Sequence, residues 1–233
     1  PVAPLKLASL EGCRTLADQV NNYLVSFRHE SPTNVGQADS LQGYCADSYL
    51  LECECPRFGS GEGKGVLKES VRGCDLFIMA DVTNHSLTYR LNGYENHMSP
   101  DNHYQDLKRI ISAADGKARR INVIMPFLYE GRQHKRSKRE SLDCALMLQE
   151  LVDMGVSNIL TFDAHDPRVS NSIPLHGFDS FMPTYQFLKA LVNSVPDFVI
   201  DNDHLMIISP DEGAMARAVY FSNILGVDMG MFY

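Results

Sequence analysis

Short apolar runs alternate with longer amphipathic runs along most of the chain. The apolar runs are rich in Leu, Ile, Val and Phe, and their length is that of buried strands. They occupy residues 5–10, 48–54, 75–81, 122–127, 158–164 and 205–211. The amphipathic runs place apolar residues at helical spacing and occupy residues 13–27, 104–115, 141–155, 185–192 and 214–226. Because parallel strands need long, usually helical connections, the alternation predicts an α/β fold with a mostly parallel sheet flanked by helices.

Composition excludes several other classes. The chain has 233 residues, of which 44% are hydrophobic, so it can bury the core of one or two domains. A formal net charge of -8 argues against general nucleic-acid binding, which calls for a basic face. No apolar run approaches the roughly 20 residues that cross a bilayer, and the first residues do not have the pattern of a signal peptide. We therefore expect a cytoplasmic protein.

The six cysteines are scattered, and the only close pair forms Cys-x-Cys at Cys53 and Cys55. That spacing fits neither a disulfide scaffold nor a zinc site, so we expect reduced thiols that fill core space. Two polar stretches, 29–46 and 84–102, are longer than typical connections, and we expect them to be inserted loops.

A concentrated cationic segment follows the strand predicted at 122–127. Five Lys or Arg residues lie within the eight positions from Arg132 to Arg139. Because this segment follows a parallel strand, it lies at the edge of the sheet where open α/β folds bind ligands. Such charge suits a ligand with several phosphates, although a solvated surface loop would carry the same residues.

Two further strands are predicted to end in acidic residues or histidine. Asp163 and His165 close one of them, and Asp211 and Glu212 close the other just before a helix. Each pattern alone is more typical of a hydrogen-bonded turn than of a site. Together with the cationic loop they match the needs of a Mg²⁺–nucleotide site, because the metal takes oxygen ligands and shares the phosphates.

At these residues the chain resembles the ribose-phosphate diphosphokinases, the PRPP synthetases. "PFLYEGRQHKRSKRES" is similar to their segment around Arg-Gln-Asp, "LTFDAHDPRV" to their Asp-Leu-His strand end and "IISPDEGAMARA" to their Ser-Pro-Asp-x-Gly turn. "LKESVRGCDLFIM" resembles their Glu-Ser-Val-Arg-Gly segment, and "RFGSGEG" resembles their Arg-Phe-Ser-(Asp/Asn)-Gly-Glu loop. The five motifs occur in the order found in that family.

The resemblance implies transfer of the diphosphoryl group of ATP to ribose 5-phosphate, with Mg²⁺ as cofactor, giving PRPP and AMP. It implies that Arg132, Gln133 and His165 bind ATP, that His165 and Asp211 are the catalytic residues and hold the metal, and that Phe58 and Glu62 reach the adenine of a neighbouring subunit. It further implies a homo-oligomer and a regulatory phosphate site. The candidates for that phosphate site are Ser70, Arg72, Arg136 and Lys138.

The resemblance also implies a fold of the phosphoribosyltransferase type (type I). We expect one complete domain over residues 1–183 and the start of a second, similar domain over residues 184–233. The family's catalytic flexible loop and its cradle for the 5-phosphate have no match in these 233 residues, so we expect the chain alone to be inactive.

Two departures from the family pattern leave alternatives open. Ser60 stands where the family has Asp or Asn, and His134 stands where it has Asp. A catalytically silent regulatory subunit of the same family would tolerate both changes. The retained His165 and Asp211 favour the enzyme. The third possibility is a nucleotide-binding module of another α/β family or a phosphoribosyltransferase proper. A phosphoribosyltransferase should show two acidic residues followed by a Thr-Gly-rich phosphate loop at a strand end, and "SPDEGAMA" is not such a loop.

Overall fold

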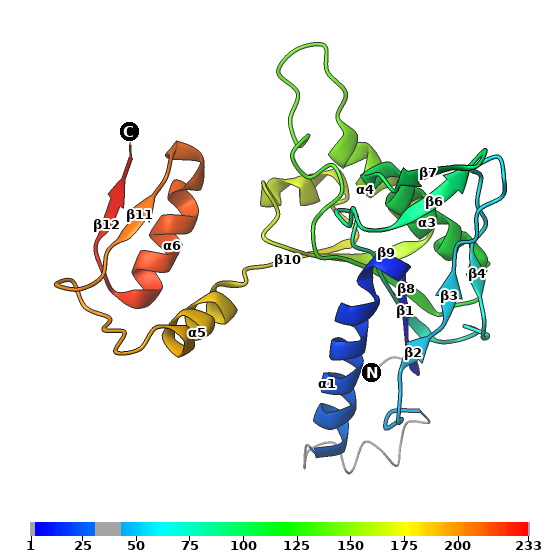
Figure 1. Ribbon diagram of the computed structural model, residues 1–233, viewed down its shortest axis with the longest axis horizontal. Coiled ribbons are helices and arrows are strands. Elements are labelled where there is room, and N and C mark those ends of the chain that lie inside the picture. The colour runs from blue at the N-terminus through cyan, green and yellow to red at the C-terminus, as the bar shows by residue number, and fades with distance from the viewer. Residues whose placement is uncertain (1–2, 31–42, 233) are drawn as a thin grey trace. The chain divides into compact units, whose positions relative to one another are not determined.

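The computed structural model describes residues 3–30 and 43–232. By the density of their contacts these residues form two compact units, Pro1–Phe181 and Met182–Tyr233, each described by itself below. The first unit contains the main sheet (Figure 1).

Within the described residues the main sheet has six strands, and every pair of neighbours in it is parallel. The order across the sheet is β10-β9-β8-β5-β1-β2. The strands are β1 (Leu5–Ser9), β2 (Leu50–Leu51), β5 (Asp75–Met79), β8 (Arg120–Met125), β9 (Val156–Phe162) and β10 (Gly177–Phe181). The predicted α/β class with a parallel sheet flanked by helices is confirmed.

Helices cover both faces of this sheet, as Figure 1 shows. Successive side chains of a strand point to opposite faces, so each strand contributes to two cores. Leu76 and Ile78 of β5 belong to the larger core, which includes apolar residues of α3 (Pro100–Ala113) and α4 (Asp143–Asp153). Met79 belongs to the smaller core, together with Ala17 of α1 (Arg14–Glu30). The unit therefore has three layers.

The prediction of a single strand over residues 48–54 was wrong about its length. Only β2 joins the main sheet, whereas β3 (Cys53–Glu54) pairs antiparallel with β4 (Val66–Leu67). Leu51 and Cys53 are buried while Glu52 and Glu54 are exposed. This alternation fits a ribbon with one solvated face better than a strand buried on both faces.

The stretch 84–102 is not an unstructured inserted loop. It contains an antiparallel hairpin, β6 (Thr88–Leu91) and β7 (Tyr94–His97), followed by the start of α3. Asn92 and Gly93 both have positive φ, 51° and 86°, which is the backbone of a type I′ turn. The Asn-Gly pair was the signal in the sequence for this hairpin.

The boundaries of the other helices and strands differ from the predicted ones by smaller amounts. The edge strand β10 was not predicted. Helix α3 begins at Pro100 rather than at residue 104, because Ser99 caps it by accepting a hydrogen bond from the backbone N–H of Asn102. Of the loop predicted over 29–46, residues 29–30 belong to α1, and residues 31–42 lie outside the described part of the chain.

The second unit contains α5 (Thr184–Ser194) and a β-α-β arrangement. The strand β11 (Ile207–Ser209) pairs in parallel with β12 (Met229–Met231), which the sequence did not predict, and α6 (Met215–Leu225) connects them. The strand expected over 205–211 is shorter than predicted and not fully buried, with Ile208 exposed. That residues 184–233 open a second domain similar to the first stays a prediction.

All six cysteines are free thiols, as expected, and Cys13, Cys53, Cys74 and Cys144 are buried. Burial raises the pKa of both Cys13 and Cys144 to about 11, so these thiols are poor nucleophiles near neutral pH. In the described part of the chain, no helix is both long and apolar enough to cross a membrane.

Candidate functional site

The cationic loop runs from the end of β8 to the start of α4 and extends away from the sheet (Figure 1). Its five cations are all exposed. Within the described residues none of their side chains has a hydrogen bond or an ion pair, so their charge is available to a ligand. They are Arg132, Lys135, Arg136, Lys138 and Arg139.

Gln133 closes the base of this loop. Its side-chain Nε2 donates to the backbone oxygen of Ser141 at 2.8 Å, and its own backbone oxygen accepts from the N–H of Cys144 at 3.3 Å. Tyr129 anchors the preceding residues to α3. Its ring stacks on Tyr104 with centroids 4.4 Å apart, and its hydroxyl donates to Asp101 at 2.6 Å. The loop is therefore closed at its base, and the residues before it are held to α3.

The structure brings His134 of this loop against the residues that follow β9. The ring centroids of His134 and His165 are 5.1 Å apart, and Nε2 of His134 lies 3.6 Å from Oδ2 of Asp166. The Nδ1 of His134 is 3.1 Å from the backbone oxygen of Arg132 and must carry the hydrogen, because a carbonyl oxygen only accepts. Sequence reasoning treated His134 as a departure and overlooked Asp166.

Asp166 is held in place by its neighbours. It caps a short helix, η3 (Pro167–Ser172), and its Oδ1 accepts from both the backbone N–H and Nε of Arg168 at 2.9 Å. These hydrogen bonds, with the charges of Arg168 and His134, hold the pKa of Asp166 well below its usual range despite some desolvation. Asp166 is therefore a fixed anion beside His134 at neutral pH.

Asp163 and His165 follow β9 in a tight turn. Asp163 has a φ of 43°, in the left-handed region that non-glycine residues seldom adopt. The turn is fixed because the N–H of Asp163 donates to the oxygen of Phe181 at 2.9 Å and the N–H of Ala164 donates to the hydroxyl of Ser180 at 2.9 Å. This backbone leaves His165 exposed at the carboxyl edge of the sheet.

Phe58 and Glu62 lie in another tight turn, between β3 and β4. The N–H of Phe58 donates to the oxygen of Glu62 at 2.7 Å, and the hydroxyl of Ser60 donates to the carboxylate of Glu62 at 2.8 Å. Both Phe58 and Glu62 are exposed. Within the described residues, this turn shares no hydrogen bond or ion pair with the cationic loop.

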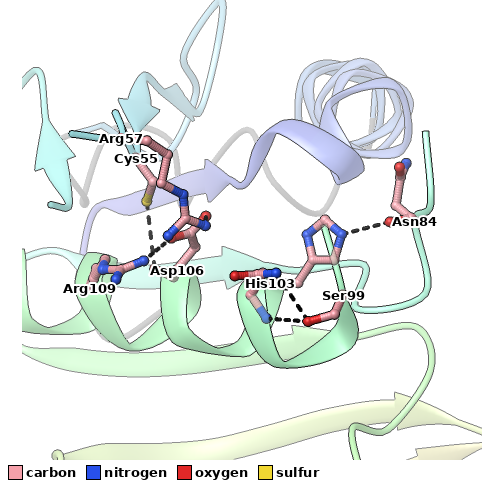
Figure 2. Close-up of polar contacts among 8 residues, drawn as sticks. Cys55, Arg57, Asn84, Ser99, His103, Asp106 and Arg109 are labelled. Atoms are coloured by element: carbon pink, nitrogen blue, oxygen red, sulfur yellow. Dashed lines mark hydrogen bonds and ion pairs between the residues drawn. The ribbon is translucent and has the colours of Figure 1, made fainter. Parts of the chain in front are cut away.

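A buried ion cluster supports the turn that carries Phe58. Figure 2 shows Asp106 of α3 between two arginines, with Arg57 Nη2 at 2.9 Å and Arg109 Nη1 at 2.6 Å from its carboxylate oxygens. Burial raises the pKa of Asp106, and the two guanidinium groups oppose the shift. The Sγ of Cys55 also lies 3.7 Å from the backbone oxygen of Asp106. The residue before Phe58 is thus fixed to a helix of the main core.

The four candidates for a phosphate site lie at opposite edges of the sheet. Ser70 and Arg72 precede β5 and so lie at its amino end, where the N–H of Arg72 is 3.3 Å from the hydroxyl of Ser70. Arg136 and Lys138 follow the carboxyl end of β8, which runs parallel to β5. One chain does not bring the two pairs together.

Asp211 belongs to the second unit. It follows β11 and caps the short helix η4 (Glu212–Ala214), where its Oδ1 accepts from the N–H of Ala214 at 2.9 Å. Its side chain is exposed. Among the described residues, no three His, Cys, Asp or Glu side chains form a cluster that could hold a metal ion.

Fold and site together define an α/β protein whose parallel sheet carries two features at its carboxyl edge. One is a histidine pair, and the other is a loop with five cations that have no partner among the described residues. The family model of the N-terminal domain of ribose phosphate pyrophosphokinase matches residues 5–155. The chain therefore belongs to the ribose phosphate pyrophosphokinase family, as the resemblance of its motifs predicted.

Curated relatives agree with this membership, and a solved structure shares the fold. The ribose-phosphate pyrophosphokinase of Staphylococcus saprophyticus is 26% identical over 179 residues, which are 76% of this chain and 50% of the relative. That of Clostridium perfringens is 27% identical over 187 residues, 78% of this chain and 52% of the relative. The phosphoribosylpyrophosphate synthetase from Mycobacterium smegmatis shares the fold, with a TM-score of 0.70 and 21% identity, over 98% of this chain and 63% of that one. The chain thus spans about half the length of these curated relatives.

Proposed function

We propose that the protein containing this chain transfers the diphosphoryl group of ATP to ribose 5-phosphate. The anomeric hydroxyl attacks the β-phosphorus, the bond to the α-phosphate oxygen breaks, and PRPP and AMP result. The observation that carries the proposal is the cationic loop, partner-free among the described residues, beside His165 in a chain whose N-terminal domain matches this family. Phosphoryl chemistry depends on positioning and on cations that meet the charge of the moving group, and this loop supplies cations.

Arg132 is the proposed phosphate ligand within this loop. Its guanidinium is exposed and makes no hydrogen bond within the described residues, and its planar donors match phosphate oxygens. The Nε2 of Gln133 is engaged in closing the loop, so its proposed contact with ATP would use the side-chain oxygen. His165, with His134 beside it, would donate hydrogen bonds to the nucleotide.

The family's chemistry implies Mg²⁺, and the residues present fit a cation that arrives with the nucleotide. Mg²⁺ commonly keeps several waters and binds through one or two carboxylates plus substrate phosphates, so no closed protein cage is needed. The described residues build no such cage, and Asp211 offers an exposed carboxylate. We propose Asp211 and His165 as the residues that hold it. The bound ion would neutralise charge on the phosphates.

A homo-oligomer would complete the site. Phe58 and Glu62 are exposed on a turn that, in the described part of the chain, has no bond to the cationic loop of the same chain, which suits recognition of adenine bound to a neighbouring subunit. A regulatory phosphate site built from Ser70, Arg72, Arg136 and Lys138 would likewise need two chains, because one chain keeps the pairs at opposite edges.

The reaction is tested by measuring AMP release from ATP and ribose 5-phosphate with Mg²⁺. A protein that carries this chain together with the remaining length of its relatives is expected to release AMP only when ribose 5-phosphate is present. The 233-residue chain alone, about half the length of those relatives, is expected to bind nucleotide and make essentially no PRPP. If the longer protein released no AMP, the proposal would be rejected and the regulatory-subunit alternative would be favoured.

Removing the Arg132 guanidinium is expected to weaken nucleotide binding. Arg132→Ala should cost about 1.5–3 kcal/mol of binding free energy, the usual contribution of a hydrogen bond to a charged group. Calorimetric titration of a non-hydrolysable ATP analogue measures the change. Arg119→Ala is the charge-matched control, because Arg119 is exposed and precedes β8 at the opposite edge of the sheet. Equal affinity of the parent and Arg132→Ala for the analogue would show that Arg132 does not bind the nucleotide.

A further inference from the structure

A cavity of about 250 Å³ lies apart from the cationic loop, at the start of α1. Its walls come from four segments: the residues that follow β1, the β3 segment with Arg57, the β6–β7 hairpin and the first turns of α3. All of its lining residues belong to the first unit. Arg57 of the "RFGSGEG" segment lines this cavity, but the proposed reaction gives no role to any of the lining residues.

The cavity lies at the topological switch point of the sheet. From β1 the chain moves to β2 on one side, and it later returns to β5 on the other side of β1. The helix α1 after β1 and the helix α3 after β5 pack on opposite faces, so a crevice forms at the carboxyl ends of these two strands. Open α/β sheets characteristically bind ligands in this crevice. Leu10, which follows β1 directly, lines the cavity.

Two lining side chains of opposite charge have no partner in the part of the chain that the structure describes. Glu11 and Arg14 lie within one turn of each other, both are exposed, and neither side chain has a hydrogen bond or ion pair within the described residues. The other charged residues of the lining are paired. Glu54 lies 2.6 Å from Lys68, and Asp106 is bound by Arg57. Among the described residues, the cavity lining therefore has one unpaired cation, Arg14, and one unpaired anion, Glu11.

The rest of the wall combines apolar residues with polar residues that are held by partners of their own. Leu10 and Met98 are buried, and the Arg57 guanidinium lies over the ring of Tyr89, 5.3 Å from its centroid. Arg57 is fixed by the buried Asp106 (Figure 2). His103 is also buried, and its Nε2 lies 2.7 Å from the backbone oxygen of Asn84, which holds the start of the hairpin segment against α3.

We propose that this cavity binds a small zwitterion, an α-amino acid with an apolar or aromatic side chain. Its carboxylate would accept hydrogen bonds from Arg14, and its ammonium group would donate to Glu11. Its side chain would lie against Leu10, Leu87 and Met98. A ligand with only a negative charge would be repelled by Glu11, and a ligand with only a positive charge would be repelled by Arg14. A zwitterion matches both charges. This site does not depend on the proposed diphosphoryl transfer.

Calorimetric titration of the 233-residue chain with L-phenylalanine and L-leucine tests the proposal. Saturable binding of at least one amino acid at one site per chain is expected. The matched probes are 3-phenylpropanoate, which lacks the amine, and 2-phenylethylamine, which lacks the carboxylate. Each should bind at least about tenfold more weakly than L-phenylalanine, as loss of one charge-assisted hydrogen bond predicts.

Two single variants test whether the amino acid binds to Arg14 and Glu11. Arg14→Gln and Glu11→Gln should each weaken amino-acid binding by about tenfold or more, and both residues are exposed, so the melting temperature should not change. Arg132→Ala should leave amino-acid binding unchanged. The proposal is overturned if neither amino acid binds, if the probes bind as well as the amino acid, or if both variants keep parental affinity.

Discussion

Asp106→Ala is expected to lower the free energy of unfolding by about 3–5 kcal/mol, because it removes the shared partner of two largely buried cations. The side chains of Asp106, Arg57 and Arg109 are only 8%, 11% and 18% exposed. Without the carboxylate, both guanidinium groups would stay desolvated and unpaired. Urea unfolding followed by circular dichroism measures the change.

Glu69→Ala is the matched control for this variant. Glu69 also pairs with a cation, Lys6, at 2.8 Å, but its side chain is 53% exposed. Exposed pairs contribute about 0–1 kcal/mol, so the control should remain close to the parent. Similar losses in the two variants would show that the buried cluster is not the stabilising element inferred here. A large loss at Asp106 alone would support it as the anchor of the turn that carries Phe58.

Gly65→Ala is expected to destabilise the chain by about 3 kcal/mol, the upper end of the usual cost of overpacking. A Cβ at this position would lie 2.4 Å from the backbone oxygen of Arg109 and 2.5 Å from its carbonyl carbon. These are backbone atoms of α3 and cannot rotate away as a side chain can. The added methyl group must therefore separate the β3–β4 ribbon from the helix.

Gly59→Ala is the control for the glycine variant. A Cβ on Gly59 would meet no atom within 4 Å, and its φ lies outside the left-handed region. Alanine there should be neutral or slightly stabilising, because it restricts the unfolded chain. Thermal unfolding of the two variants side by side checks the difference. If the two variants had the same melting temperature, the inference that the β3–β4 ribbon packs closely against α3 would be wrong.

The parallel sheet was predictable because its signal is local. Residues such as Leu76 and Ile78 lie in continuous apolar runs, and a strand buried on both faces is read directly from such a run. The position of the cationic loop followed from the same reasoning, since a segment after a parallel strand must lie at the carboxyl edge. The family's motifs then added candidate residues that no periodicity could have supplied.

The elements that were missed are those whose formation depends on a neighbour. The edge strand β10 contains Gly177, and it pairs along its whole length with β9. The hairpin β6–β7 has largely exposed side chains, so its strands show little apolar pattern, although Asn92-Gly93 marked the turn. Cross-strand hydrogen bonds form these elements, and single-strand patterns do not report them.

The sequence by itself determined the α/β class, the strands β1, β5, β8 and β9, and the cationic character of the loop after β8, because short-range periodicity and charge are properties of contiguous residues. Only the tertiary structure decided which side chains meet. It placed His134 beside His165 and Asp166, and it joined Arg57 to Asp106 across 49 residues. Such contacts depend on how whole elements pack, and the free energy that selects the packing is spread over the core rather than written in any one segment.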